Sequence, residues 1–413
     1  MSGHNLRSVG QIWSSNQEDK NYDQPSETLH ESNIFWRLLL LNRIGVVAGK
    51  MTLLRKINRV LLMLLILMVY VILYSKMHRA PPPPSHIETR AEPGVAGRVA
   101  ANEVTADEVA EAEDDILVVV CAAEERMGAA MATINSIRSN TEASVFFYIV
   151  TLHDTVKYAR QYIQKSELKD IKYKILEFNP MVLKGRVRPD SSRPELLHPL
   201  NFVRFYLPLL VVRHKRAIYL DDDVIVQGDI QELYKTRLEP GHAAAFASDC
   251  DLPSEVVRSM GMQTTYMGFL DYRKLEVREL GINPSDCSFN PGVIVADIEV
   301  WKRQKITKQL ETWMQHNLRT NLYSSAMAGG VATPPMLIVF HEKHTTIDPM
   351  WHVGHLGWSP DTLYSEASLQ EAQLLHWSGR FKPWDYPAVH MELWERWYVP
   401  DPTGKFSLVR PDS

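Results

Sequence analysis

The chain of 413 residues has only three cysteines, and none of them has the paired spacing of a zinc site. It contains no Gly-x-Gly-x-x-Gly fingerprint and no Walker sequence, which argues against a dinucleotide-binding or P-loop enzyme. Neither sign of charge dominates, because the formal net charge is −4, so no nucleic-acid partner is expected. N-glycosylation is not expected either, because no Asn-x-Ser/Thr sequon has a permitted middle residue.

The few cysteines leave two states open. In an oxidising compartment Cys250 and Cys287 could form a disulfide and leave Cys121 buried in a strand. Three free thiols are the alternative.

Long hydrophobic runs are also scarce, and the one strong run covers Val60–Tyr74. Its 15 apolar residues are fewer than the ~17–25 of a usual span, but Arg59 and Lys76 can snorkel outward. A cleaved signal peptide is disfavoured because no small-residue cleavage site follows. A buried core helix is disfavoured because a proline run, Pro81–Pro84, comes soon after. We therefore expect a membrane-spanning signal-anchor over residues 60–75.

The flanks of this run predict its orientation. More Lys and Arg residues precede the run than follow it, which favours a cytoplasmic N-terminus. The expected organisation is a cytoplasmic segment over 1–59, the anchor, a flexible lumenal stem over 76–114 and a globular domain over 115–413. The chain would then be a single-pass type II protein of the Golgi or another secretory-pathway membrane, in contact with the bilayer through one helix.

Strand-like and helix-like runs alternate through the globular part, which predicts an α/β fold with a mainly parallel sheet flanked by helices. The predicted strands cover residues 116–121, 145–152, 171–178, 217–226, 242–248 and 294–300, and the predicted helices cover 127–138, 153–165 and 301–318. In such sheets, ligands bind beyond the carboxyl ends of the strands.

An acidic triplet, Asp221-Asp222-Asp223, interrupts the strand predicted over 217–226. On an extended backbone Asp221 and Asp223 would point to the same face, with Cα atoms about 6–7 Å apart. Two such carboxylates suit one hard divalent cation, Mn²⁺ or Mg²⁺. Without a cation, one of two buried carboxylates would tend to protonate. The alternative reading of the triplet is a solvated acidic turn.

A second motif, His-x-x-Gly-x-x-Lys-Pro-Trp, runs from His376 to Trp384. Imidazole binds Mn²⁺ alongside carboxylates. Gly379 allows close approach of the backbone to a ligand, and Lys382 supplies an ammonium that can neutralise a diphosphate. Together the two motifs predict a site for a metal ion and a diphosphate.

With these two motifs the chain resembles the retaining glycosyltransferases of family 8, the group of glycogenin and of bacterial galactosyltransferases, over residues 116–406. The resemblance implies a GT-A fold, a UDP-sugar donor and Mn²⁺ (or Mg²⁺) held by Asp221, Asp223 and His376. It implies donor-binding roles for the strand-end residues Ala122, Ala123 and Glu124, for Arg204 and Asp222, and for Gly379 and Lys382. It further implies that Asp249, Asn290 and Arg204 lie where the sugar reacts.

One stretch departs from the family pattern. The family commonly has an acidic-Gln-acidic stretch beside the anomeric carbon, and the corresponding stretch here is Thr333-Pro334-Pro335. The expected activity is therefore retaining transfer of a hexose or related sugar from a UDP-sugar to a hydroxyl of an unidentified glycan, lipid or protein. The alternative is a catalytically impaired, membrane-anchored scaffold that binds UDP or a glycan.

Overall fold

The computed structural model describes residues 114–188, 194–323, 332–360 and 364–410, together with Met63, Met68 and Ala112. The chain divides into two units, Met1–Gly94 and Val95–Ser413, and the fold described below belongs to the second. Among the described residues no helix has the length and apolar character needed to cross a membrane. The anchor predicted over 60–75 lies outside them, apart from Met63 and Met68.

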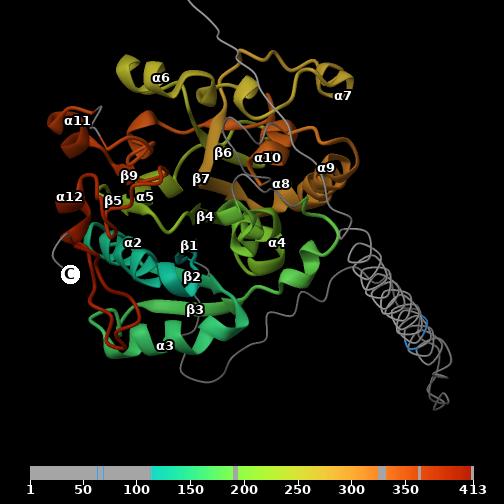
Figure 1. The fold of residues 1–413 in the computed structure, drawn as a ribbon. Coiled ribbons are helices and arrows are strands. Elements are labelled where there is room, and N and C mark those ends of the chain that lie inside the picture. Colours follow the sequence, from blue (N-terminus) through green and yellow to red (C-terminus); the bar gives the residue numbers. More distant parts are fainter. Residues whose placement is uncertain are drawn as a thin grey trace, which may run out of the picture. The chain divides into compact units, whose positions relative to one another are not determined.

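A seven-stranded sheet with the strand order β3-β2-β1-β4-β7-β6-β8 forms the centre of the second unit (Figure 1). Its strands are β1 (Ile116–Cys121), β2 (Val145–Thr151), β3 (Lys172–Glu177), β4 (Arg216–Leu220), β6 (Ala244–Ser248), β7 (Phe289–Asp297) and β8 (Thr345–Thr346). Only β7 pairs antiparallel with its neighbours, β4 and β6, while the other pairs in this sheet are parallel. The predicted α/β fold with a mainly parallel sheet is confirmed.

Helices cover both faces of this sheet (Figure 1). They are α2 (Met127–Ser139), α3 (Val156–Lys165), α4 (Leu207–Leu210), α5 (Ile230–Tyr234), α6 (Ser254–Met260), α7 (Leu275–Arg278), α8 (Ile298–Arg303), α9 (Ile306–Thr320), α10 (Thr333–Phe340), α11 (Glu366–Glu371) and α12 (Met391–Glu395).

The alternation of side chains along β1 explains the two hydrophobic cores. Val118 and Val120 pack on one face with α2, α3 and the C-terminal segment. Leu117 and Val119 pack on the other face with α4, α8, α9 and α10. Because both faces are covered, β1 and β2 are buried along their whole length, which is why they appear as continuous apolar runs.

The strand predicted over 217–226 was wrong as a single element. It is two strands, β4 and β5 (Val224–Val226), and they belong to different sheets. β5 pairs antiparallel with β9 (Leu374–His376) in a separate two-stranded sheet. The chain turns between β4 and β5 at residues 222–223, because the partner of β5 lies away from the main sheet.

Two further boundaries differ from the predictions. The helix predicted over 301–318 is two helices, α8 and α9, with Lys305 between them at a φ of 55°. The strand predicted over 294–300 ends at Asp297, whose side chain accepts a hydrogen bond from the backbone N–H of Val300 and starts α8. The apolar periodicity continues through both breaks, so it does not reveal them.

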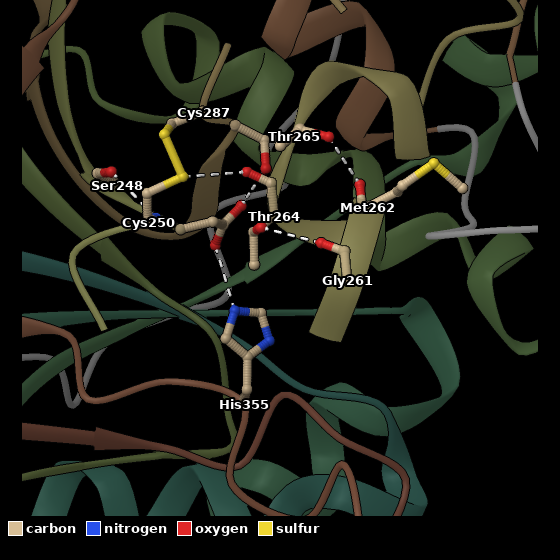
Figure 2. The surroundings of a disulfide bond; sticks show 10 residues. Ser248, Cys250, Gly261, Met262, Thr264, Thr265, Cys287 and His355 are labelled. Carbon is tan, nitrogen blue, oxygen red and sulfur yellow. Dashed lines mark hydrogen bonds and ion pairs between the residues drawn. A yellow bond between two sulfur atoms is a disulfide. The ribbon is translucent and has the colours of Figure 1, made fainter. Parts of the chain in front are cut away.

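A disulfide joins Cys250 to Cys287, while Cys121 is a buried free thiol (Figure 2). Of the two states left open by the sequence, the structure has the bridged one. The bond ties the loop after β6 to the segment that enters β7, 37 residues further along the chain.

Replacing both bridged cysteines with serine should lower the free energy of unfolding by about 2–4 kcal/mol, because the crosslink restricts the unfolded chain. Urea unfolding of the oxidised protein and of the Cys250→Ser/Cys287→Ser variant measures this difference. Reduction of the unsubstituted protein should give a similar loss. Equal stability of all three forms would show that the crosslink contributes nothing to stability.

Candidate metal and diphosphate site

The acidic triplet lies in the turn between β4 and β5, at the carboxyl end of β4. The backbone N–H of Asp221 donates to the carbonyl of Gly292, which continues the pairing of β4 with β7. Asp222 and Asp223 are buried, and Asp221 is partly exposed. The alternation argument for the triplet was wrong in its geometry, because a turn and not an extended strand orients these side chains.

His376 reaches the triplet through the small sheet. The pairing of β5 with β9 sets His376 opposite Val224, next to the turn. Its Nε2 atom lies 3.0 Å from Oδ1 of Asp223, although 153 residues separate the two in sequence. One donor atom from each of Asp221, Asp223 and His376 lies within 4.8 Å of the other two. The three predicted ligands therefore converge.

Arg204 pairs with the first carboxylate of the triplet. It comes from the 3-10 helix Pro199–Tyr206, and its guanidinium donates to Asp221 Oδ1 at 2.8 Å and to the carbonyl of Pro291 at 2.6 Å. The hydroxyl of Tyr219 donates to the same Oδ1 atom at 2.9 Å, and its ring lies under the guanidinium. Arg204 is thus fixed beside Asp221 by a buried charge-assisted network, and its role toward a donor stays a prediction.

Two cations compensate the other carboxylates. Lys382 donates to Asp223 Oδ2 at 2.6 Å and to the carbonyl of Trp377. Arg126 donates to both oxygens of Asp222 and lies 3.1 Å from Asp223 Oδ2. The sequence analysis missed Arg126, because a single arginine after two glutamates at a strand end has no motif signal.

The pKa values of the triplet are shifted in opposite directions. Burial raises the pKa of Asp222, and Arg126 offsets only part of this rise. Burial would also raise the pKa of Asp223, but Lys382, His376 and Arg126 outweigh it and hold the value well below its usual range. Burial lowers the pKa of Lys382. Asp223 is therefore ionised throughout the physiological range and remains available to a cation.

Close backbone approach shapes two sides of the site. A Cβ atom on Gly292 would lie 2.5 Å from the His376 ring and 2.7 Å from Asp221 Oδ2, so only glycine fits between these two ligands. The approach of Gly379 to a diphosphate stays a prediction, but the structure shows a close contact within the protein. A Cβ atom there would lie 2.1 Å from the backbone of Gly357 and Trp358, so its close contact is with another loop of the protein.

The two predicted sugar-side residues occupy different surroundings. Asn290 lies at the start of β7, and its Oδ1 accepts from the N–H of Gly292, beside Asp221 and His376. The carboxylate of Asp249 accepts from the hydroxyl of Ser288 at 2.6 Å and lies 3.4 Å from Nε2 of His355. Figure 2 shows the ring of His355 pointing toward the part of the chain that carries Cys250 and Thr264.

The residues predicted to line a nucleotide pocket lie at the end of β1. Ala122 and Ala123 are buried, and the carbonyl of Ala122 accepts from the hydroxyl of Thr151. Glu124 begins the short 3-10 helix Glu124–Arg126, and its carboxylate accepts from the ammonium of Lys405 at 2.8 Å. Glu124 is two residues from Arg126, which contacts Asp222 and Asp223, but the side chain of Glu124 itself is paired with the C-terminal segment.

The stretch that departs from the family pattern, Thr333-Pro334-Pro335, forms the first turn of α10. Both prolines are buried there, in positions where proline is tolerated because the first turn has no intrahelical partners for its N–H groups. The turn presents neither a carboxylate nor a side-chain amide.

Comparison with known proteins decides the family. The family model described as Glycosyl transferase family 8 matches residues 117–388. The chain belongs to glycosyl transferase family 8. A relative called Glycosyltransferase 8 domain-containing protein 2, from Bos taurus, is 61% identical over 367 residues, which cover 88% of this chain and 100% of the relative. The family predicted from the two motifs is therefore confirmed.

The solved structures of two glycosyltransferases have a similar fold. The galactosyltransferase LgtC, in complex with donor and acceptor sugar analogs, has a TM-score of 0.50 at 13% identity and covers 72% of this chain and 98% of its own. The bifunctional glycosyltransferase WbbM has a TM-score of 0.50 at 16% identity over 70% of this chain, which spans 50% of that enzyme. At these identities the likeness shows a GT-A-like α/β fold for this member of the family.

Replacing Arg126 with methionine should lower the free energy of unfolding by about 2–3 kcal/mol, because Asp222 would keep a buried charge without a partner. The double variant Arg126→Met/Asp222→Asn should lose less, because the charge that needs compensation is gone. Urea unfolding of both variants checks this difference. Arg273→Met, which breaks an exposed pair with Asp271, is the matched control and should leave stability nearly unchanged. A double variant as unstable as the single one would contradict the charge argument.

Proposed function

We propose that this protein transfers a sugar from a UDP-sugar to an acceptor hydroxyl with retention, and that the reaction depends on Mn²⁺ or Mg²⁺. The observation that carries the proposal is the convergence of Asp221, Asp223 and His376 within 4.8 Å. Family membership supports glycosyl transfer as the reaction class.

The donor set fits the proposed cation. Two carboxylates and one imidazole are ligands that Mn²⁺ accepts, and the depressed pKa of Asp223 keeps its carboxylate free of a proton. Gly292 has no side chain to crowd Asp221 and His376, which lie 2.7 and 2.5 Å from where its Cβ atom would be. When bound, the metal would supply Lewis-acid stabilisation of the charge that develops on a departing diphosphate.

The surrounding cations fit a diphosphate. Arg126 and Lys382 both contact Oδ2 of Asp223, whereas His376 contacts Oδ1, so two positive charges lie beside one of the proposed metal ligands. The side chain of Arg126 is 30% exposed, and its guanidinium lies over the ring of Trp384, a planar arrangement that suits recognition of a phosphate. Arg204, in contrast, is buried and would act as a fixed positive charge.

The proposed retaining step is a same-face substitution. The bond between the anomeric carbon and the phosphate oxygen breaks as the acceptor oxygen forms its bond to the same carbon. The acceptor proton passes to the leaving phosphate oxygen. We propose that Asn290, which lies next to Asp221, contacts the donor sugar, and that Asp249 also contacts it.

We further propose that the catalytic unit lies in the lumen of a secretory-pathway membrane, attached through the hydrophobic segment over 60–75. The disulfide between Cys250 and Cys287 supports this location, because disulfides persist in oxidising compartments.

The variant Asp223→Asn should lose at least about 100-fold in Mn²⁺-dependent turnover of a UDP-sugar, because a metal ligand contributing several kcal/mol is removed. Release of UDP from a panel of UDP-sugars, with and without Mn²⁺, measures the effect. Asp154→Asn, an exposed aspartate away from the site, is the matched control and should keep full turnover. Unchanged turnover in a folded Asp223→Asn variant would rule out the proposed metal role.

A second candidate is a scaffold that binds UDP with the metal but does not turn over donors. The buried prolines in the first turn of α10 favour it, because they offer no side chain to the anomeric carbon. Calorimetric binding of UDP that requires Mn²⁺, without UDP release from any donor of the panel, would identify the scaffold. Measurable transfer to an acceptor would eliminate it.

A further inference from the structure

A second buried histidine lies directly behind the proposed metal ligand. Nε2 of His352 is 2.9 Å from Nδ1 of His376, and both side chains are 2% exposed. The backbone holds this pairing from both sides, since Val353 donates to the carbonyl of Leu374 and His376 donates to the carbonyl of Val353. The position of the His352 ring is therefore fixed by a parallel backbone bridge between the next residue, Val353, and Leu375 of β9.

A metal on Nε2 of His376 imposes a proton arrangement on this pair. Nε2 must be unprotonated to bind a cation, so the neutral ring carries its proton on Nδ1. A histidine that binds a metal almost always donates its other ring N–H to a neighbouring acceptor. The acceptor within hydrogen-bond distance is Nε2 of His352, which must then carry its own proton on Nδ1.

The arrangement without a cation is different. Nε2 of His376 faces the ionised carboxylate of Asp223 at 3.0 Å, so this nitrogen carries a proton and donates to Asp223. Nδ1 of His352 has no hydrogen-bond partner among the described residues, so no other group of those residues fixes the tautomer of this ring. The outer ring can therefore accept or donate toward His376 as the metal requires.

We propose that His352 is a positioning residue for the metal site: it accepts the Nδ1 proton of His376 and so fixes the tautomer and ring orientation in which Nε2 binds the cation. This inference rests on the proposed function, because it assigns His352 a role toward the same cation. Removing such a partner weakens metal binding about 10–100-fold in known sites.

Calorimetric titration of the full-length protein with Mn²⁺, in the presence of UDP, tests the role directly. His352→Phe keeps a ring of similar volume but removes the acceptor, and it should weaken Mn²⁺ binding about 10–100-fold. His352→Gln can place an amide oxygen near the position of Nε2, and it should bind Mn²⁺ within about threefold of the unsubstituted protein. His344→Phe, at a histidine packed against Phe246 and Phe289, is the matched control and should bind Mn²⁺ normally.

The outcomes separate this inference from the proposed function. Normal Mn²⁺ binding by His352→Phe, with binding lost in Asp223→Asn, would overturn the role of His352 and leave the metal site intact. Equal weakening by His352→Phe and His352→Gln would also overturn it, since the defect would then be one of packing. If the unsubstituted protein and Asp223→Asn titrate alike, the proposed metal site itself fails.

A second measurement avoids substitution, in case the phenylalanine variant does not fold. In protein labelled with ¹⁵N in histidine and saturated with Mg²⁺ and UDP, the ring of His352 should be protonated on Nδ1 and unprotonated on Nε2. A protonated Nε2 of His352 in this state would overturn the inference, because that nitrogen could not accept from His376.

Discussion

Compensation of three adjacent buried or half-buried carboxylates is the constraint on which the site depends. Asp221, Asp222 and Asp223 leave β4 together, and each meets a cation from a different part of the chain: Arg204, Arg126 and Lys382, respectively. A buried carboxylate without a partner would cost several kcal/mol or protonate. The 3-10 helix before α4, the end of β1 and the loop after β9 must therefore all reach one turn. Charge balance and the packing of the sheet select the same arrangement.

The sequence could predict the part of this arrangement that depends on local patterns. β1, β2 and α2 lie where their apolar periodicity placed them, and the two motifs correctly identified the residues that converge. The split of β4 from β5 could not be predicted, because an apolar strand looks the same whichever sheet receives it. The partner of β5 is β9, about 150 residues further along the chain, and only the folded structure shows that these two strands pair.

The residues missed by sequence reasoning share one property. Each becomes significant only through the residue that it contacts in the folded protein, and no local sequence pattern marks it. Arg126 is an ordinary charged residue until Asp222 and Asp223 are placed beside it. His352 is one histidine among 15, and its significance depends on the 2.9 Å contact with His376. The predicted residues Glu124 and Gly379 show the converse, since their positions are near the expected site but their closest contacts are with Lys405 and with the backbone of Gly357.

The balance of charge at the turn also indicates how ligands would enter. Three carboxylates and three cations meet there, so a divalent metal alone would add uncompensated positive charge, and a diphosphate alone would add negative charge beside the triplet. Under the proposed function, a metal and a diphosphate that bound together would largely cancel each other's charge beside Lys382 and Arg126. Because like charges at a few ångströms in a poorly solvated site repel strongly, each ligand should favour the binding of the other. The partners of the three carboxylates hold these side chains in place without any ligand, which is the preorganisation that the proposed transfer from a metal-bound diphosphate would require.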